Sequence, residues 1–458
     1  MSTLLRRFCD DRCAVLLEVG RNATLLSVFK VTFIGAGSVE FTRNVVTDLC
    51  SFAELRGDLH LALHDVSPER LRHAEELARR IVTQTGSAAT VTASLDRRAA
   101  LQGARYVINE IQVGGYGATR LDFDIPAGYG VRQTIGDTLG IGGIFRGLRT
   151  IPVVTGIAED MLRECPDACQ LNYSNPMAML PWAVYEGTAF GNVFGLCHSV
   201  RDTHSFLAGL VGLDPAEVDF LTAGFNHQAF VLRFEAGGRD LYPRLTEVID
   251  GSPELQRRVR VELFRRFGYF PTESSEHSAE YLPWFMRHDG EIERFRIFVG
   301  DYLARSEENL REYESLQGQL DAGTPLDLTP TDELASQFIH SLETGTEREI
   351  YVNVRNDGLI TSLPGQCCVE VPCDVGAAGA WPRSIGVLPP QLAALNRTFL
   401  NVVELTVRAA LDGSREHVYQ AALLDPNTAA TLTTTQTVAM CDDLLDAHKA
   451  TLPAGLIR

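Results

Sequence analysis

The cysteine in residues 197–200 (CHSV) and the histidine in residues 224–227 (GFNH) are the side chains of this sequence best suited to holding a divalent metal. A closed structural zinc site needs four ligands, so Cys197 and His227 are too few for one. An incomplete ligand set is typical of a catalytic metal, because the substrate fills the remaining positions. In isolation, a buried thiol and a hydrogen-bonded core histidine would explain the pair more simply.

Two predicted strands place polar groups near this pair. Residues 168–172 are followed by the loop 173–178 (YSNPMA), in which Asn175 is held extended by the following proline and can point into a cleft. Residues 192–196 form the next predicted strand and deliver Cys197 at its carboxyl end. Open α/β sheets bind ligands at that edge, so the position favours a functional cysteine.

A strand, a glycine turn and a helix are predicted near the start of the chain. Residues 30–34 form the strand, and Gly35, Gly37 and Ser38 lead from it into a helix at residues 41–50. This arrangement lets backbone N–H groups approach a pyrophosphate. Glu40 stands where the fingerprint has its third glycine, so a plain tight turn is the alternative.

Asp65 ends a second predicted strand, residues 59–65. A carboxylate there can accept hydrogen bonds from both ribose hydroxyls of NAD and would repel a 2′-phosphate, so NAD is preferred over NADP. A helix N-cap is the alternative role. A helix at 69–85 and strands at 89–94 and 106–110 complete a βαβ series, in which Asn109 is expected to contact the cofactor.

Glycines are frequent between residues 114 and 143, ahead of a helix predicted to start near residue 144. Such a segment is typically mobile or closely applied to a ligand. Arg146 and Arg149 lie on one face of the helix, where substrate contact and an ordinary salt-bridged surface are both compatible with the spacing. A second helix is predicted at residues 153–164.

The predicted fold class is α/β: a Rossmann-like doubly wound parallel sheet followed by a mixed α+β domain for substrate binding and oligomerisation. The pattern changes near residue 218, where antiparallel strands at 219–222 and 229–234 precede a helix-rich region. We therefore expect an extension of unknown role at residues 1–29, an NAD-binding domain at 30–225 and a substrate-binding and oligomerisation domain at 226–458.

The amino-acid composition limits the kinds of molecule that the protein is expected to bind. The 458 residues include 59 acidic and 41 basic ones, and the net charge of −18 argues against nucleic acid or an anionic membrane. Ten cysteines without disulfide-dense or zinc-ribbon spacing indicate reduced thiols. With no long apolar span either, the sequence predicts a cytoplasmic protein that acts on a small molecule.

Several segments, taken in order, resemble glycoside hydrolase family 4, and they lie between about residues 30 and 450. The CHSV motif is similar to that of the α-galactosidase branch. The matching segments are residues 31–38, 137–144, 149–152, 172–178, 197–200, 224–227, 267–269, 273–277 and 369–373.

The resemblance implies hydrolysis of α-glycosides, most simply α-galactosides, with NAD and Mn²⁺ or another divalent metal as cofactors. The implied reaction oxidises C3 of the sugar transiently, removes the C2 proton with help from the metal, and eliminates the aglycone. The pair of catalytic carboxylates that most glycosidases use is not required by NAD-dependent ones. Family members assemble as homodimers or homotetramers, which is expected here too.

The resemblance also implies roles for single residues. Cys197 and His227 would hold the metal. Tyr281 would be the catalytic base, provided that a cation lowers the pKa of its phenol, although a core tyrosine is the alternative. His198 would protonate the leaving group. Glu276, His277 and Tyr269 are the other candidate bases, and the residues expected to bind sugar are Asn175, Asn172, Asp137 and Arg146.

Other functions stay open at this point. An α-glucosidase or an α-galacturonidase would have the same motifs. A sugar or hydroxy-acid dehydrogenase would share the glycine turn, and a regulatory protein could retain NAD binding with an inactive site.

Overall fold

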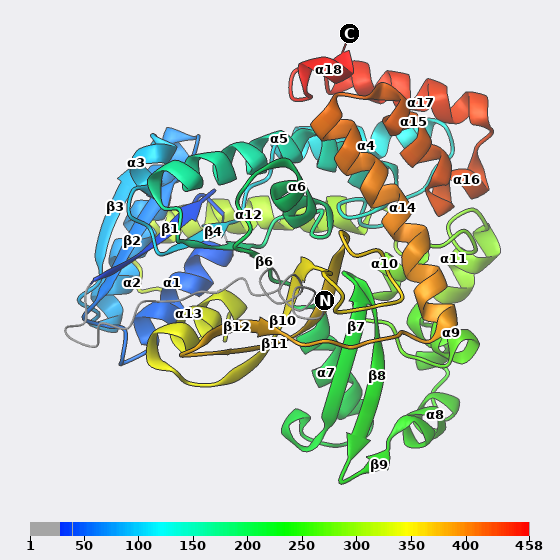
Figure 1. Ribbon diagram of the computed structural model, residues 1–458, viewed down its shortest axis with the longest axis horizontal. Coiled ribbons are helices and arrows are strands. Elements are labelled where there is room, and N and C mark those ends of the chain that lie inside the picture. The colour runs from blue at the N-terminus through cyan, green and yellow to red at the C-terminus, as the bar shows by residue number, and fades with distance from the viewer. Residues whose placement is uncertain (1–27, 39, 458) are drawn as a thin grey trace, which may run out of the picture.

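A sheet of twelve strands runs through the molecule (Figure 1), of which the computed structural model describes residues 28–38 and 40–457. Six strands lie in the order β3-β2-β1-β4-β5-β6, with all neighbours parallel. This is the order of a doubly wound dinucleotide-binding fold, so the predicted class is confirmed. The six strands are β1 Phe29–Ile34, β2 Leu59–His64, β3 Thr90–Ser94, β4 Tyr106–Asn109, β5 Cys169–Asn172 and β6 Val193–Gly195.

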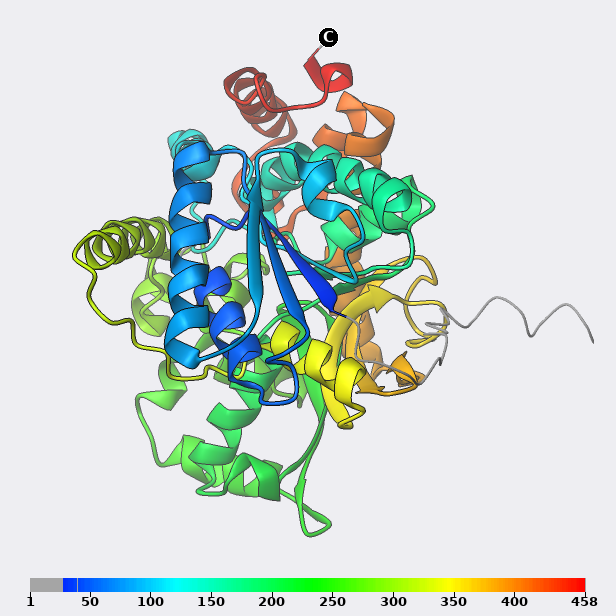
Figure 2. The same cartoon turned by 90° about the vertical axis from the view of Figure 1, so that its left-hand side faces the viewer.

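Helices cover both faces of these strands, as parallel strands that are buried on both faces require. Figure 2 shows the long helix α2 on one side of the sheet and α3 and α5 on the other. Ser67 caps α2 by accepting a hydrogen bond from the N–H of Arg70, and Pro68 occupies the first turn. The shorter helices of this half are α1 Phe41–Ser51, α3 Arg97–Leu101, α6 Met179–Gly187 and α7 Ser199–Leu210, and α2 is Pro68–Thr85.

The glycine-rich region differs from the prediction. It contains a helix, α4 Gly115–Gly128, and α5 Gly140–Glu164 is one helix that continues through Pro152 instead of two. Burial of most of α5 outweighs the backbone hydrogen bond that Pro152 cannot donate. The segment 131–139 between the two helices is almost entirely buried. It touches the first turn of α5 so closely that a Cβ on Gly142 would lie 2.5 Å from the carbonyl oxygen of Gly136.

The second half of the chain extends the same sheet. Beyond β6 the order is β10-β11-β7-β8-β9, and β12 pairs with β11. These strands are antiparallel to their neighbours. The predicted boundary at residue 225 falls in the tight turn between β7 and β8, so the sheet is not divided there. The strands are β7 Asp219–Phe225, β8 Gln228–Ala236, β9 Arg239–Asp240, β10 Arg348–Arg355, β11 Cys368–Gly376 and β12 Gly379–Pro382.

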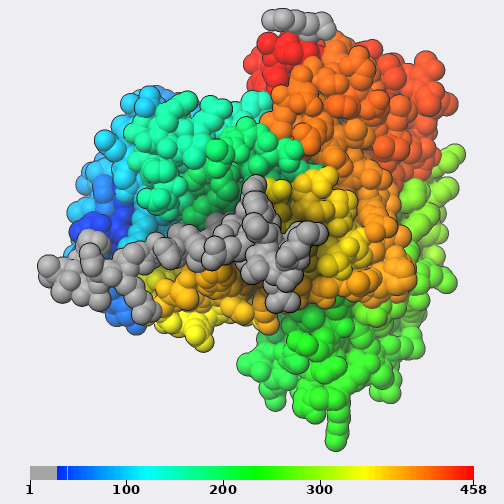
Figure 3. Space-filling view, in the orientation of Figure 1, coloured from blue at the N-terminus to red at the C-terminus, as the bar shows by residue number. Residues whose placement is uncertain are grey.

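The C-terminal helices return to the first half, where α14 packs against α5 and α6 and α17 packs against α4 (Figure 1). The strands β7 to β9 and helix α8 project at the opposite end (Figure 3). The remaining helices are α8 Tyr242–Asp250, α9 Val259–Phe267, α10 Ser275–Glu280, α11 Asp289–Phe295, α12 Asp301–Asp321, α13 Leu334–Thr344, α14 Pro390–Asp412, α15 Arg415–Leu424, α16 Pro426–Thr431, α17 Thr434–Ala447 and α18 Ala454–Ile457.

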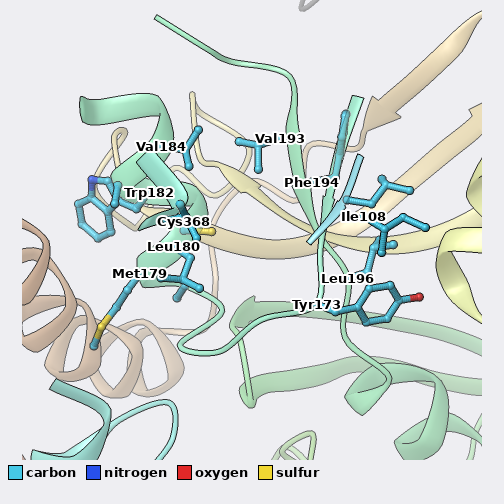
Figure 4. Close-up of a cluster of buried hydrophobic side chains, with 14 of the residues drawn as sticks. Ile108, Tyr173, Met179, Leu180, Trp182, Val184, Val193, Phe194, Leu196 and Cys368 are labelled. Atoms are coloured by element: carbon cyan, nitrogen blue, oxygen red, sulfur yellow. The ribbon is translucent and has the colours of Figure 1, made fainter. Parts of the chain in front are cut away.

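One hydrophobic core joins the two halves. Figure 4 shows Ile108 of β4, Phe194 of β6, Trp182 of α6 and Cys368 of β11 in the same buried cluster. Burial of apolar surface contributes about 25 cal/mol per Å², so this shared core stabilises both halves together. The expected extension, apart from Val28 and Phe29, lies outside the described residues.

Two further expectations concern cysteines and membranes. The cysteines in the described part of the chain are all free thiols, and most are buried. Within the same residues, no helix has the length and apolar character needed to cross a membrane.

Candidate active site

Cys197, His227 and Glu273 form a cluster that could hold a metal ion. The Cys197 Sγ lies 3.1 Å from the His227 Nε2, and a carboxylate oxygen of Glu273 lies 3.9 Å from the same nitrogen. The three ligand atoms all lie within 4.8 Å of one another. A thiolate, an imidazole and a carboxylate are the usual protein ligands of divalent transition metals, so the donor set fits a metal.

The fold brings these three residues together from distant segments. Cys197 follows the end of β6, and His227 lies in the turn between β7 and β8. Glu273 precedes α10, next to a segment that bridges to β8 through Phe230 and Pro271. His227 and Glu273 have φ angles of 63° and 67°. Left-handed backbone at non-glycine residues costs on the order of 1 kcal/mol and is concentrated at functional sites, which supports a role for this turn and segment.

Hydrogen bonds orient the imidazole of His227. Thr138 donates its hydroxyl proton to Asp137 at 2.8 Å, so its oxygen can accept a hydrogen bond from the His227 Nδ1–H at 3.2 Å. This fixes a proton on Nδ1 and directs Nε2 at Cys197, where Nε2 can bind a metal once its own proton is lost. A ligand histidine commonly has its other nitrogen fixed in this way.

The electrostatics of the cluster follow from burial and neighbouring charge. Burial lowers the pKa of His227, but negative charge at Cys197 and Glu273 outweighs it and raises that pKa to about 10. Burial would raise the pKa of Glu273, whereas His277, His227 and Arg260 lower it below the usual value. Burial lowers the pKa of His277 to about 4, so its imidazole is neutral. The raised pKa means that His227 carries a second proton at neutral pH in the metal-free protein, and a metal ion would take the place of that proton.

Asn175 and Arg146 lie beside this cluster. The Asn175 Nδ2 donates to Asp137 at 2.9 Å, and the Arg146 Nε donates to the backbone oxygen of Asn175 at 3.1 Å. The Asn175 Oδ1 is buried and finds no hydrogen-bond partner among the described residues. It can accept a hydrogen bond from a hydroxyl of a bound molecule. The Asn175–Pro176 peptide bond is cis.

Several residues predicted to contact ligands are used elsewhere. Asn109 and Asn172 are buried and hydrogen-bonded to each other at 2.7 Å, below the ends of β4 and β5. Asp137 is also buried, and its two oxygens accept from Thr138 and Asn175. Asn172 and Asp137 therefore support the site instead of lining it, whereas the Asn109 Oδ1 finds no partner among the described residues, so its predicted contact with the cofactor stays a prediction. Arg149 forms a buried ion pair with Asp122 at 2.6 Å, in agreement with the salt-bridged alternative.

The geometry around Tyr281 conflicts with a role as the catalytic base. Its side chain is fully buried, and its hydroxyl lies 3.4 Å from the His227 Nδ1, on the side of the ring away from Cys197. Burial raises the pKa of this phenol well above its usual value. The core-tyrosine alternative agrees better with this position, in which Tyr281 supports His227.

His198 is oriented by a carboxylate that the sequence did not indicate. Its Nε2 lies 2.8 Å from Glu333, which also accepts a hydrogen bond from Tyr173 at 3.1 Å. The imidazole stacks on Phe41 with ring centroids 6.0 Å apart. Phe41 lines a large neighbouring cavity, and His198 directly follows Cys197 in the chain, so its imidazole is close to both sites.

The cavity has a volume of about 700 Å³ and lies over the glycine turn. Its lining includes Gly35, Ser38 and Asp65. A Cβ on Gly37 would lie 2.7 Å from Asp65, whose carboxylate accepts the N–H groups of Gly37 and Ser67. Each carboxylate oxygen keeps a second acceptor site, so a ribose can still be bound. Glycines in the turn and an acid at the end of β2 fit a dinucleotide.

Glu273, Thr138 and Glu333 are the functional candidates that sequence reasoning missed. Glu273 and Thr138 lie in the conspicuous segments 273–277 and 137–144, so the motifs held a signal for them. No local pattern marks Glu333, because its partner His198 is distant in the chain.

Known protein families match both halves of the chain. The model of the family 4 glycosyl hydrolases matches residues 30–213, and that of the family 4 glycosyl hydrolase C-terminal domain matches residues 222–428. An alpha-galactosidase of Bacillus subtilis (strain 168) is 42% identical over 429 residues, covering 93% of this chain and 99% of the relative. An alpha-galactosidase of Rhizobium meliloti (strain 1021) is 36% identical over 445 residues, covering 93% and 90%.

Among solved structures, a 6-phospho-alpha-glucosidase from gut microorganisms in complex with NAD and Mn²⁺ has a similar fold. Its TM-score is 0.78 at 19% identity, over 93% of this chain and 99% of that one. The likeness extends through both halves of the sheet. The two family models divide the chain between residues 213 and 222, ahead of most of β7.

Proposed function

The chain belongs to family 4 of the glycosyl hydrolases, and from this membership we propose that it hydrolyses α-galactosides with NAD and a divalent metal, preferably Mn²⁺, as cofactors. The observation that carries the proposal is the Cys197, His227 and Glu273 cluster beside a glycine-turn cavity. Identity of 42% to an alpha-galactosidase over nearly the whole chain favours galactosides among the substrates of the family.

The residues have distinct tasks in this proposal. Cys197, His227 and Glu273 would hold the metal, and the glycine turn with Asp65 would hold the dinucleotide. When bound, NAD supplies a reversible hydride acceptor for oxidation of the sugar, and the metal supplies Lewis acidity that stabilises negative charge on neighbouring sugar oxygens.

The protein side chains around the cluster bind and orient the sugar. The free Oδ1 of Asn175 accepts a hydrogen bond from a sugar hydroxyl, while Arg146 and Asp137 fix the asparagine in place. His198 protonates the oxygen of the leaving group, and Glu333 orients its imidazole. Tyr281 keeps His227 in place.

An activity assay tests this function. Purified protein with NAD⁺, Mn²⁺ and a thiol should release nitrophenol from a nitrophenyl α-galactoside, and release should stop when either cofactor is omitted. Nitrophenyl α-glucoside and α-galacturonide should react more slowly. Release that is equal without cofactors, or absent from all three substrates, would contradict the proposal. NADH should not accumulate, whereas a sugar dehydrogenase would produce it stoichiometrically. The Cys197→Ser variant is the inactive control.

The proposed chemistry also suggests where and how the protein works. A metal-binding thiolate needs reducing conditions, which supports the prediction of a cytoplasmic location. The homodimer or homotetramer expected from the sequence stays a prediction.

A further inference from the structure

The Thr42 hydroxyl has two acceptor groups as neighbours, and a proton on Glu110 would satisfy both contacts. The Thr42 Oγ1 lies 2.9 Å from the backbone oxygen of Ala36 and 2.5 Å from a carboxyl oxygen of Glu110. A hydroxyl has one proton, and the carbonyl oxygen can only accept. If Thr42 donates to Ala36, the contact to Glu110 needs a proton from the carboxyl group. Glu110 then donates to Thr42 as a neutral acid.

Glu110 belongs to the wall of the dinucleotide cavity. Glu110 follows the end of β4 and lines the cavity together with Gly35. A Cβ on Gly35 would lie 3.0 Å from the Glu110 backbone oxygen, so the glycine turn and Glu110 are in direct contact. The Oε2 atom is buried and has no hydrogen-bond partner among the described residues. A polar atom left in this state indicates a partner supplied by a bound molecule.

Burial and neighbouring negative charge favour the neutral form of Glu110. Two of the surrounding groups are carboxylates, which raise its pKa, and two are hydroxyls, which lower it. Burial raises the pKa of Glu110 to about 8, the hydroxyl of Thr42 lowers it, and the charge of Glu333 raises it further. Arg70, a cation beside the turn, is hydrogen-bonded to the Gly37 backbone oxygen. The groups facing Glu110 are Ser38 of the turn, Thr42 of α1, Asp65 after β2 and Glu333 before α13.

We propose that Glu110 contacts the dinucleotide as a neutral carboxylic acid, and that cofactor affinity therefore depends on the proton that it carries. The inference rests on the proposed NAD cofactor and adds a binding residue to it. A pyrophosphate that crosses the glycine turn brings negative charge next to Glu110. An ionised Glu110 would repel it, whereas the neutral acid offers its free oxygen to a ribose hydroxyl or an amide N–H.

The sign of the pH effect follows from linkage. Glu110 is protonated below about pH 8, so affinity for NAD⁺ is constant there. Above that pH the apo-protein must take up a proton to bind, and the dissociation constant rises toward tenfold per pH unit. The dissociation constant stops rising once the pH exceeds the pKa of Glu110 in the complex, which is higher than its pKa in the apo-protein.

Binding of NAD⁺ from pH 6 to 9.5 tests the inference. Isothermal titration of the full chain should show a dissociation constant that is flat to about pH 7.5 and rises above pH 8. The Glu110→Gln variant keeps the shape and cannot ionise, so its dissociation constant should stay flat throughout. Glu69→Gln, an exposed position in the first turn of α2, is the control and should behave as wild type.

Proton uptake gives a second measurement that needs no variant. Titrations of wild type in buffers of different ionisation enthalpy should show uptake of about half a proton per NAD⁺ at pH 8 and none at pH 6.5. The same pH dependence in Glu110→Gln, or no uptake at pH 8, would overturn the role of Glu110 while leaving NAD as cofactor. Failure of NAD⁺ to bind wild type at any pH would overturn both proposals.

Discussion

Glu273 adds an oxygen donor to a sulfur and nitrogen pair. Thiolate and imidazole ligands suit zinc, whereas a carboxylate suits Mn²⁺. Loss of the carboxylate charge should therefore weaken Mn²⁺ binding more than Zn²⁺ binding. We expect Glu273→Gln to lower the affinity for Mn²⁺ by about 10–100-fold, measured by calorimetry or by the spin resonance signal of free Mn²⁺.

Glu276 provides the matched control for this variant. It lies in the first turn of α10, outside the ligand cluster, so Glu276→Gln should bind Mn²⁺ as wild type does. Equal Mn²⁺ affinity in Glu273→Gln and wild type would show that the Glu273 carboxylate is not a ligand.

The single residues show which part of a site sequence can predict. Cys197 and His227 could be predicted as a pair because both types bind metals and both end or join strands. The orientation of the Tyr281 side chain could not be predicted, since a motif does not show which nitrogen of His227 the hydroxyl approaches. The position of Asn172 against Asn109 could not be predicted for a related reason. The ends of neighbouring strands can bond to each other, as these two amides do at 2.7 Å.

At the scale of elements, the buried segment 131–139 depends on one carboxylate. Glu280 of α10 accepts the backbone N–H groups of Thr134, Ile135 and Gly136 at 2.7, 3.0 and 2.9 Å. The same segment carries Asp137 and Thr138, which orient His227. Glu280 thus connects α10 to the residues behind the metal cluster.

Glu280→Gln should disturb this segment, because the amide nitrogen of glutamine would face N–H donors. A buried donor without a partner costs about 1–3 kcal/mol, so the free energy of unfolding should fall by that amount. Urea unfolding of the metal-free protein measures it. Mn²⁺ affinity should fall as well, since Thr138 would no longer be held. Glu308→Gln, at an exposed position of α12, should change neither. Unchanged stability in Glu280→Gln would mean that the segment holds itself in place.

Strands and helices with a clear hydrophobic period could be predicted from the sequence. Elements that depend on tertiary contacts could not. The strands of the first half follow apolar runs and were confirmed within a residue or two. Helix α4 was missed because glycines at its start and within it disfavour a helix in isolation. Helix α5 was divided at Pro152, although burial of its faces keeps it continuous.

At the scale of the molecule, the two halves join within one sheet. Asn353 of β10 pairs with Gly195 of β6, and Glu370 of β11 pairs with Gly224 of β7. Glu370 is fully buried there and accepts hydrogen bonds from Asn226 and Asn353. The alternation of apolar and polar side chains predicts a strand but not which strand pairs with it. The sequence could therefore indicate two regions but not that they share one continuous sheet.

Buried acids spread over both halves make the stability of the molecule depend on pH. Burial raises the pKa of Glu370 and of Glu280 to about 7 and that of Glu110 to about 8. These values lie above those of an unfolded chain, so the stabilisation is complete at low pH and is lost as pH rises through the folded pKa. His227, whose pKa is raised to about 10, acts in the same direction above pH 6.5.

Between pH 6.5 and 8.5, the free energy of unfolding of the metal-free protein should therefore fall by several kcal/mol, at about 1.4 kcal/mol per pH unit for each group while it titrates. The opposite contribution of His277, whose pKa is lowered to about 4, is already complete above pH 6.5 and does not interfere. Urea unfolding with a chelator at constant ionic strength measures the change. Replacing Glu110 by Gln should flatten the slope, because the neutral side chain has no proton to lose. Stability that rises with pH over this interval would show that these carboxyl groups are already ionised in the folded protein.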